Sequence, residues 1–241
     1  MDRVCNVVSP HLDDATLSMS LFLAANPGCR VITVFAGGPA SVRPLTAWDK
    51  AARYFPEGAD VAAVRRGEDI SASAMLGATS HHLRFWDRQY RNGAYGYDGE
   101  PEDELPAIIA EELLARAAER PGQAWVFPLG LGHPDHRAAA DAGLLFARRQ
   151  PGEVYVYEDL PYAVENPRGV AERKEQLTQR GFTLAGAATI EGNGSRAVKA
   201  AAIGCHVSQR RLLGRRIRKA VRAPERIWRL EAGQRRGEDQ A

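Results

Sequence analysis

The feature of this 241-residue chain that most limits its possible folds is a regular alternation of short apolar runs with segments of helical spacing. Strand-like apolar runs occupy residues 4–8, 31–36, 83–86, 125–129 and 154–157. Helical spacing occupies residues 16–25, 61–76, 104–119, 137–149 and 169–180. This alternation predicts an α/β fold: a Rossmann-like open, mostly parallel sheet with helices on both faces. Continuous apolar strands also suit a sheet that is covered on both sides.

The chain shows no internal repeat and no Ser/Gly linker that would separate a second unit. A single α/β domain can reach about 250 residues, so we expect one domain over residues 1–231 and a disordered tail at residues 232–241. The segment 207–230 is basic and has Leu213, Ile217 and Val221 at four-residue spacing, which predicts an amphipathic helix. Its charges indicate a solvated face; the alternatives are an anionic partner, an anionic part of the substrate, or a membrane surface.

Composition excludes several classes of protein. Hydrophobic residues make up 44% and charged residues 26%, which is ordinary for a soluble globular chain, and a net charge of +2 predicts no particular partner. The three cysteines fit neither a disulfide framework nor a CxxC zinc site. No signal peptide, apolar run of membrane-spanning length or nucleic-acid-binding module is recognisable. We therefore expect a cytoplasmic protein with reduced thiols, no membrane span and no nucleic-acid partner.

Polar residues follow three of the predicted strands. The strand at 4–8 leads into "SPHLDD", the strand at 125–129 leads into "GLGHPDH", and the strand at 83–86 leads directly into Asp87. In open α/β sheets, ligands bind at the carboxyl ends of the strands. These three segments are therefore expected to meet at the edge of the sheet that carries the active site.

The first and second of these segments predict a metal site. His11 and Asp14 lie three residues apart across a strand-to-helix turn, so both side chains can face one point. His136 is the candidate for a third ligand, because its segment also follows a strand and opens a helix. Three protein ligands with one open position are typical of catalytic zinc.

The residues between these ligands predict acid–base chemistry. Asp13 is placed to take a proton from water at the metal, whose pKa zinc lowers to about 7. His133 is left to donate a proton or to stabilise a developing oxyanion, and Asp135 to orient the ring of His133. Together these roles describe metal-assisted hydrolysis of an amide.

Each segment also has a simpler interpretation. Asp13 or Asp14 alone is more often the N-cap of a helix than part of a metal site. His133 and His136 alone are more often surface histidines at a helix start. Two such clusters at strand-to-helix junctions on the same predicted edge favour the metal site.

The segments "SPHLDDATLS" and "GLGHPDHRAA" resemble the PIG-L/LmbE-like family of zinc-dependent de-N-acetylases, which act on N-acetylglucosaminyl compounds. Further segments are similar to family segments: "VRRGEDISASAMLGA" at 64–78, "FWDRQYR" at 85–91 and "KAAAIGCHVSQ" at 199–209. The resemblance therefore covers nearly the whole chain up to residue 209, and its first two motifs are the specific ones.

The resemblance implies roles for named residues. Zinc ligands carry over to His11, Asp14 and His136, the general base to Asp13, and the acid or oxyanion role to His133, with Asp135 as its partner. Arg65 and Asp87 match positions that hold the sugar or its attached group, and His206 lies in a matching segment without an assigned role. The family's first motif usually ends in Glu, whereas this chain has Ala15. That departure puts metal affinity in doubt but leaves the ligand set complete.

Two long loops, 37–60 and 88–103, leave the predicted ligand edge and are rich in Gly, Pro, Tyr and Asp. Loops of this length are often functional. We expect Tyr95 and Tyr97 to line the sugar pocket. Trp48 and Tyr54 are placed equally well against substrate or over the core beneath the loop.

The sequence therefore predicts a hydrolase that uses Zn²⁺, or Fe²⁺ in the cell, to remove an N-acetyl or other N-acyl group from an aminosugar, as on an N-acetylglucosaminyl small molecule or glycosylated natural product. The closest alternative is a mycothiol-conjugate-type amidase of the same fold. Alternatives of other classes are a metal-dependent phosphoester hydrolase and a non-catalytic sugar-binding relative. The first of these needs more carboxylates than the sequence offers, and the second has no need for a base beside an open metal site.

Overall fold

The computed structural model describes residues 4–150, 152–191 and 195–233. Their strands are β1 (Cys5–Ser9), β2 (Arg30–Thr33), β3 (Thr79–His82), β4 (Ala124–Pro128), β5 (Val154–Tyr157), β6 (Phe182–Ile190) and β7 (Glu225–Ala232). All seven strands of this described part join one sheet in the order β3-β2-β1-β4-β5-β7-β6. The five strands from β3 to β5 are parallel, and β7 pairs antiparallel with both β5 and β6. The predicted α/β fold with a mostly parallel sheet is confirmed.

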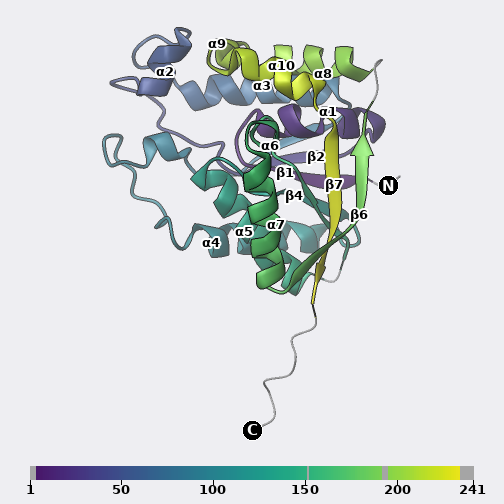
Figure 1. Ribbon diagram of the computed structural model, residues 1–241. Helices are drawn as coiled ribbons and strands as arrows, with labels where there is room; N and C mark the ends of the chain where they lie inside the picture. The colour runs from purple at the N-terminus through teal and green to yellow at the C-terminus, as the bar shows by residue number, and fades with distance from the viewer. Residues whose placement is uncertain (1–3, 151, 192–194, 234–241) are drawn as a thin grey trace.

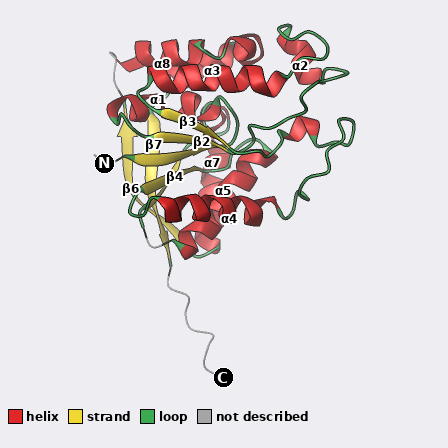
Figure 2. Ribbon diagram, turned by 180° about the vertical axis from the view of Figure 1, so that it is seen from behind, coloured by secondary structure: helices red, strands yellow, loops and turns green. Residues whose placement is uncertain are grey.

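Helices cover both faces of the sheet. The α-helices are α1 (Asp14–Ala25), α2 (Ala47–Ala52), α3 (Val61–Met75), α4 (Leu105–Glu119), α5 (Pro134–Arg149), α6 (Tyr162–Glu165), α7 (Pro167–Gln179), α8 (Ser195–Gly204), α9 (Arg210–Leu213) and α10 (Arg215–Arg222). Figures 1 and 2 show α1, α3 and α8 stacked on one face, and α4, α5 and α7 on the other. None of the helices in the described ranges is long and apolar enough to cross a bilayer.

Helix α1 lies inside the molecule and not on its surface. Ten of its twelve residues, 14–23, are buried, because α8 and α10 pack against it in addition to β1 and β7 of the sheet. Strand β1 is equally enclosed, with Val7 paired to Val31 on one side and to Val126 on the other. The chain therefore holds the β1–α1 turn rigidly from all sides, which suits a site that must position several side chains.

The sheet also fixes where a ligand can bind. Along the chain, β1, β2 and β3 are added in one direction, and β4 and β5 are added on the other side of β1. The loops that leave the carboxyl ends of β1 and β4 therefore run in opposite directions. In open α/β sheets this switch point is where a ligand crevice forms. It is also the place where the sequence puts its two His/Asp segments.

Two predicted elements differ from the structure. The strand expected at 83–86 is found at Thr79–His82, a polar edge strand, while Arg84 and Trp86 form only isolated bridges. The prediction of a single helix at 207–230 is wrong. Gly214, at φ +46°, separates α9 from α10, and Pro224 follows the end of α10.

Residues 225–232 enter the sheet as β7, with Ile227, Trp228 and Leu230 buried, because the sheet needs a partner for the edge of β5. The tail predicted at 232–241 begins inside this strand at Ala232; residues 234–241 lie outside the described residues. The single-domain boundary at residue 231 stays a prediction.

Candidate active site

The turn between β1 and α1 is shaped by hydrogen bonds from short polar side chains. The hydroxyl of Ser9 donates to the carbonyl of His11 (2.6 Å) and accepts from the amide of Ala15 (2.9 Å). The amide of His11 in turn donates to Asp14 Oδ2 (2.8 Å). Asp13 stands at the N-cap position of α1 but its side chain makes no capping hydrogen bond. Asp13 therefore does not cap α1 with its side chain, and Asp14 binds the amide of His11, which precedes the helix.

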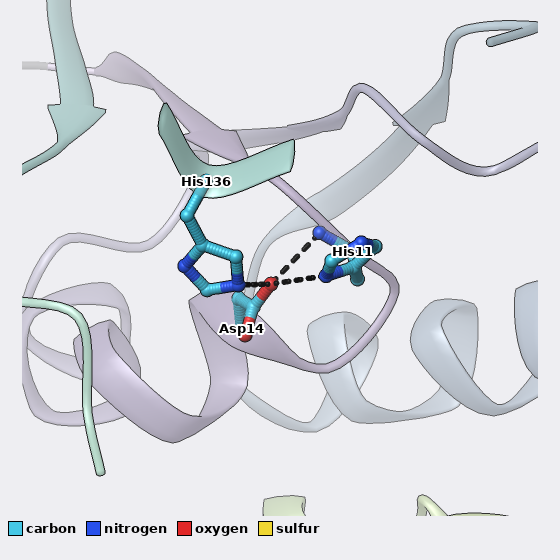
Figure 3. Close-up of side chains that lie close together, drawn as sticks. All are labelled: His11, Asp14 and His136. Atoms are coloured by element: carbon cyan, nitrogen blue, oxygen red, sulfur yellow. Dashed lines mark hydrogen bonds and ion pairs between the residues drawn. The ribbon is translucent and has the colours of Figure 1, made fainter. Parts of the chain in front are cut away.

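His11, Asp14 and His136 converge as predicted (Figure 3). Asp14 Oδ2 lies 3.2 Å from His11 Nδ1 and 3.0 Å from His136 Nε2. Each of the three residues offers one possible metal-ligand atom, and these three atoms lie within 4.8 Å of one another. His136 Nε2 is buried and makes no hydrogen bond within the described residues, although Asp14 is close. Two imidazoles and a carboxylate with an unused buried nitrogen fit a divalent cation such as zinc.

The two histidines are oriented by further carboxylates on their far nitrogens. His11 Nε2 lies 3.0 Å from Asp135 Oδ2, and His136 Nδ1 lies 2.7 Å from Asp159 Oδ1. A carboxylate on one ring nitrogen fixes the tautomer and leaves the other nitrogen's lone pair for a metal. Asp159 is itself held by the amides of Gly130 and Leu131 at 2.9 and 3.3 Å.

Asp159 was missed by sequence reasoning. A signal for it existed: the apolar strand β5 runs into Glu158 and Asp159 just as β1 and β4 run into their own His/Asp segments. Strand β5 lies next to β4, so its carboxyl end opens at the same edge of the sheet. A fourth strand end therefore contributes to the site.

The carboxylate of Asp135 does not orient His133 as predicted. It accepts hydrogen bonds from Arg91 Nη2 (2.5 Å) and from the amide of Arg88 (3.1 Å), and its nearest approach to His133 Nδ1 is 4.0 Å. The backbone amide of Asp135 donates to His133 Nδ1 instead (3.2 Å). This assignment places the His133 proton on Nε2, so the ring can act as a hydrogen-bond donor.

The charges around the cluster favour a cation at its centre. Burial lowers the pKa of His136, but Asp14 and Asp159 outweigh it and raise the pKa to about 9. Burial likewise opposes the raised pKa of His11, which Asp87, Asp135 and Asp14 hold well above its usual range. His133 differs, because burial and the positive charge of His11 lower its pKa. The carboxylates therefore make the ligand positions attractive to positive charge, which a metal cation supplies when it replaces the imidazole protons, whereas burial favours the neutral form of His133.

A cavity of about 240 Å³ opens beside the cluster, with His11, Asp13, Asp14 and His133 in its wall. Arg65 and Asp87 line it as predicted. The guanidinium of Arg65 lies 3.2 Å from Asp87 Oδ2 and 3.6 Å from Asp13 Oδ1. The basic side chain thus bridges the proposed base and the proposed sugar-binding carboxylate.

Three predicted substrate contacts lie elsewhere. Tyr95 and Tyr97 do not line this cavity: their hydroxyls donate to the carbonyls of Pro44 (2.8 Å) and Glu100 (3.0 Å). His206 is buried behind the wall, with Nε2 3.1 Å from the hydroxyl of Thr16 in α1. Local folding of the loop that holds the tyrosines, and packing of η2 (Val207–Gln209) behind α1, account for these positions.

Other wall residues were not foreseen. Trp48, which sequence placed equally well on substrate or core, lines the cavity and donates from Nε1 to Gln209 Oε1 (3.2 Å). The remaining unforeseen members of the wall are Leu17, Gln89, Pro161, Tyr162, Gln209, Leu213 and Arg216. Leu17 and Gln89 follow the predicted residues Asp14 and Asp87 closely, whereas the other five come from segments distant in sequence that no local pattern marks.

These features fit the class of metal-dependent hydrolases on an α/β sheet, with candidate ligands on two strand-to-helix turns. A family model described as GlcNAc-PI de-N-acetylase, PIG-L, matches residues 6–147. The match spans more than half of the chain, so this protein belongs to the PIG-L family and is an enzyme of the deacetylase type. No curated protein matches the sequence.

Solved structures of deacetylases have the same fold. The chain is 28% identical to a deacetylase of the teicoplanin biosynthesis pathway, with a TM-score of 0.80 over 99% of this chain and 100% of the other. It is also 28% identical to the A40926 pseudoaglycone deacetylase Dbv21, with a TM-score of 0.76 over 95% and 97%. A zinc-inhibited form of the teicoplanin deacetylase Orf2 is 27% identical, with a TM-score of 0.77 over 99% and 100%.

Proposed function

We propose that this enzyme is a zinc-dependent hydrolase that removes an N-acetyl group from an aminosugar on a glycosylated natural product. The observation that carries the proposal is the convergence of His11, Asp14 and His136 beside a cavity that Asp13 and His133 also line. The family assignment supports amide hydrolysis over phosphoester hydrolysis. Similarity to teicoplanin and A40926 deacetylases supports a glycosylated natural product as the acceptor. The cytoplasmic location stays a prediction.

Zinc held by His11, Asp14 and His136 would lower the pKa of water and polarise the amide carbonyl. Asp13 accepts the proton of the attacking water as its oxygen bonds to the carbonyl carbon. The Nε2–H of His133 donates a hydrogen bond to the oxyanion that develops. The C–N bond then breaks, the nitrogen takes up the proton from Asp13, and acetate and a free aminosugar result.

The opposite part of the cavity is suited to the sugar. Arg65 offers N–H donors, Asp87 offers carboxylate acceptors, and Gln89 offers both within reach of one another: Gln89 Nε2 lies 3.3 Å from Asp87 Oδ2. Such paired donors and acceptors match sugar hydroxyls. The half-exposed indole of Trp48 adds an apolar face at the rim.

The test is a hydrolysis screen with the full chain loaded with one equivalent of zinc. One equivalent is chosen because the similar deacetylase Orf2 has a zinc-inhibited form. N-acetylglucosaminyl lipids, thiol precursors and glycopeptide pseudoaglycones are each followed for free amine and for acetate, with and without EDTA. Equimolar amine and acetate that disappear with EDTA are expected. Release of phosphate without amine, or no amine from any of these compounds, would overturn the proposal.

A further inference from the structure

The cavity beside the cluster has two chemically different walls. Arg65, Asp87 and Gln89 form the polar one described above. Leu17, Pro161, Tyr162 and Leu213 also line the cavity and supply apolar surface, beside the polar groups of Gln209 and Arg216. Three of these four side chains are buried and Tyr162 is half-buried. A sugar is recognised by polar groups and an acyl chain by apolar ones, so the apolar wall is the place for the acyl group.

Tyr162 stands at the end of this apolar wall, next to the cluster. Its ring packs edge-on against the ring of His136, with the centroids 5.1 Å apart. On the cavity side the guanidinium of Arg216 lies 4.6 Å from the ring centroid, and Glu165 holds that guanidinium at 3.0 Å. The tyrosine ring is therefore fixed from two directions.

Gly132 shows how closely the backbone approaches this ring. A Cβ atom at Gly132 would lie 2.1 Å from Tyr162 Cδ1, far below any real contact distance. Gly132 has a φ of +77°, a conformation that glycine adopts at little cost. The backbone of the loop before α5 thus packs directly against the ring of Tyr162.

Behind the ring lies a second cavity, of about 310 Å³. Its wall includes Leu131 and Gly132 before α5, Arg137 of α5, Glu165 and Asn166 where α6 meets α7, and Glu172, Arg173 and Gln176 of α7. Tyr162 is the one described residue that lines both this cavity and the one beside the cluster. Tyr162 therefore lies between the two cavities and forms a partition there.

We infer that Tyr162 sets the length of the acyl group that the enzyme removes, by ending the acyl part of the cavity just beyond an acetyl methyl. This inference rests on the proposed function, because it assumes N-acyl hydrolysis at the cluster. It also bears on the alternative of an amidase for larger acyl groups. A closed partition favours acetyl, whereas such an amidase would need the space behind it.

The experiment measures kcat/KM for N-acetyl, N-propanoyl and N-butanoyl derivatives of the same aminosugar, with wild type, Tyr162→Ala and Tyr162→Phe. One misplaced methylene changes kcat/KM by roughly 10–200-fold, so the wild type should strongly prefer acetyl. In Tyr162→Ala the acetyl-to-butanoyl ratio should fall at least about 10-fold. Tyr162→Phe keeps the ring and should keep the wild-type ratio. Tyr54→Ala, an exposed tyrosine outside both cavities, is the matched control.

A second readout does not depend on turnover. Binding of the product carboxylates acetate and butanoate is measured by calorimetry, and only butanoate should bind more tightly to Tyr162→Ala. If Tyr162→Ala folds poorly, as its thermal midpoint would show, Tyr162→Leu should give an intermediate change. An unchanged ratio and unchanged butanoate affinity in a folded variant would overturn the inference. A wild type that cleaves none of the three derivatives would instead overturn the proposed function.

Discussion

Two groups of buried charges lie along helix α1, and they differ in whether their polar atoms have hydrogen-bond partners. The first is the cluster of His11, Asp14 and His136 at the amino end of the helix. The second is the ion pair of Lys199 and Glu225, farther along the helix, whose side chains are both 0% exposed and 2.8 Å apart. Glu225 also accepts hydrogen bonds from the amides of Leu21 and Phe22, each 3.0 Å long. The pair therefore has hydrogen-bonded partners, whereas His136 Nε2 in the cluster lies near Asp14 Oδ2 but makes no hydrogen bond within the described residues.

The difference teaches which buried charges serve chemistry. A charge pair that is fully enclosed and fully hydrogen-bonded does nothing for a ligand, and its removal is felt in the free energy of unfolding. A cluster that opens on a cavity and lacks one partner is completed by something from outside. Changes to the cluster should therefore act mainly on activity and metal binding, and changes to the pair mainly on stability.

Removal of the metal should have the largest effect. EDTA, or the substitution Asp14→Ala, should abolish amide hydrolysis, since the cluster then lacks the cation that activates water and carbonyl. Zinc at 100-fold above its Kd should stabilise the wild type by about 2.7 kcal/mol in urea unfolding, and should not stabilise Asp14→Ala. Full activity after exhaustive chelation would contradict the claim that the cluster of His11, Asp14 and His136 needs a cation.

Asp13→Asn should lower kcat by about 10²–10⁴-fold, because an amide cannot take the proton of the attacking water. Zinc content, measured by atomic absorption, should stay at the wild-type level, since Asp13 is outside the ligand set. A variant that binds zinc and keeps full activity would refute the role of Asp13 as the base.

Lys199→Met should lower the free energy of unfolding by about 3–5 kcal/mol, because it leaves the carboxylate of Glu225 buried without its counter-charge. The folded fraction should keep the wild-type kcat. The double variant Lys199→Met with Glu225→Leu should recover much of the loss, since both charges are then gone. Arg168→Ala, which removes an exposed ion pair with Glu172, should cost under about 1 kcal/mol. Equal losses of unfolding free energy in the buried and exposed variants would contradict the claim that the enclosed pair of Lys199 and Glu225 contributes to stability.

Among the changes at the site, the smallest effect is expected from the carboxylate behind His136. Asp159→Asn should weaken zinc binding by about 10–100-fold, because the histidine loses the group that fixes its tautomer. Competition with a chelator of known affinity measures this change. An unchanged affinity would mean that the amides of Gly130 and Leu131 are the true reason for Asp159.

The sequence was informative where function depends on local geometry. His11, Asp13 and Asp14 occupy a single strand-to-helix turn, and His133 and His136 occupy another, so residue spacing alone aligns their side chains. The parallel part of the sheet was predictable for a similar reason, because strand and helix alternate along the chain.

Features that depend on tertiary packing could not be predicted. Tyr162 and Leu213 reach the cavity from segments with no recognisable motif, and only the folded chain brings them to one wall. The hydroxyls of Tyr95 and Tyr97 turn to nearby carbonyls, a choice that composition does not reveal. The sequence predicts helix where the structure has strand β7, because its basic residues continue the pattern of α10, although Pro224 marks the change.

The central claim is that a single cation is bound by His11, Asp14 and His136, and a crystal structure of the zinc-loaded protein with anomalous scattering at the zinc edge tests it most directly. The account predicts one ion about 2.0–2.2 Å from His11 Nδ1, a carboxylate oxygen of Asp14 and His136 Nε2. A second group of His11, His133 and Asp135 also brings three ligand atoms within 4.8 Å. An ion bound there, with His136 unbound, would contradict the account.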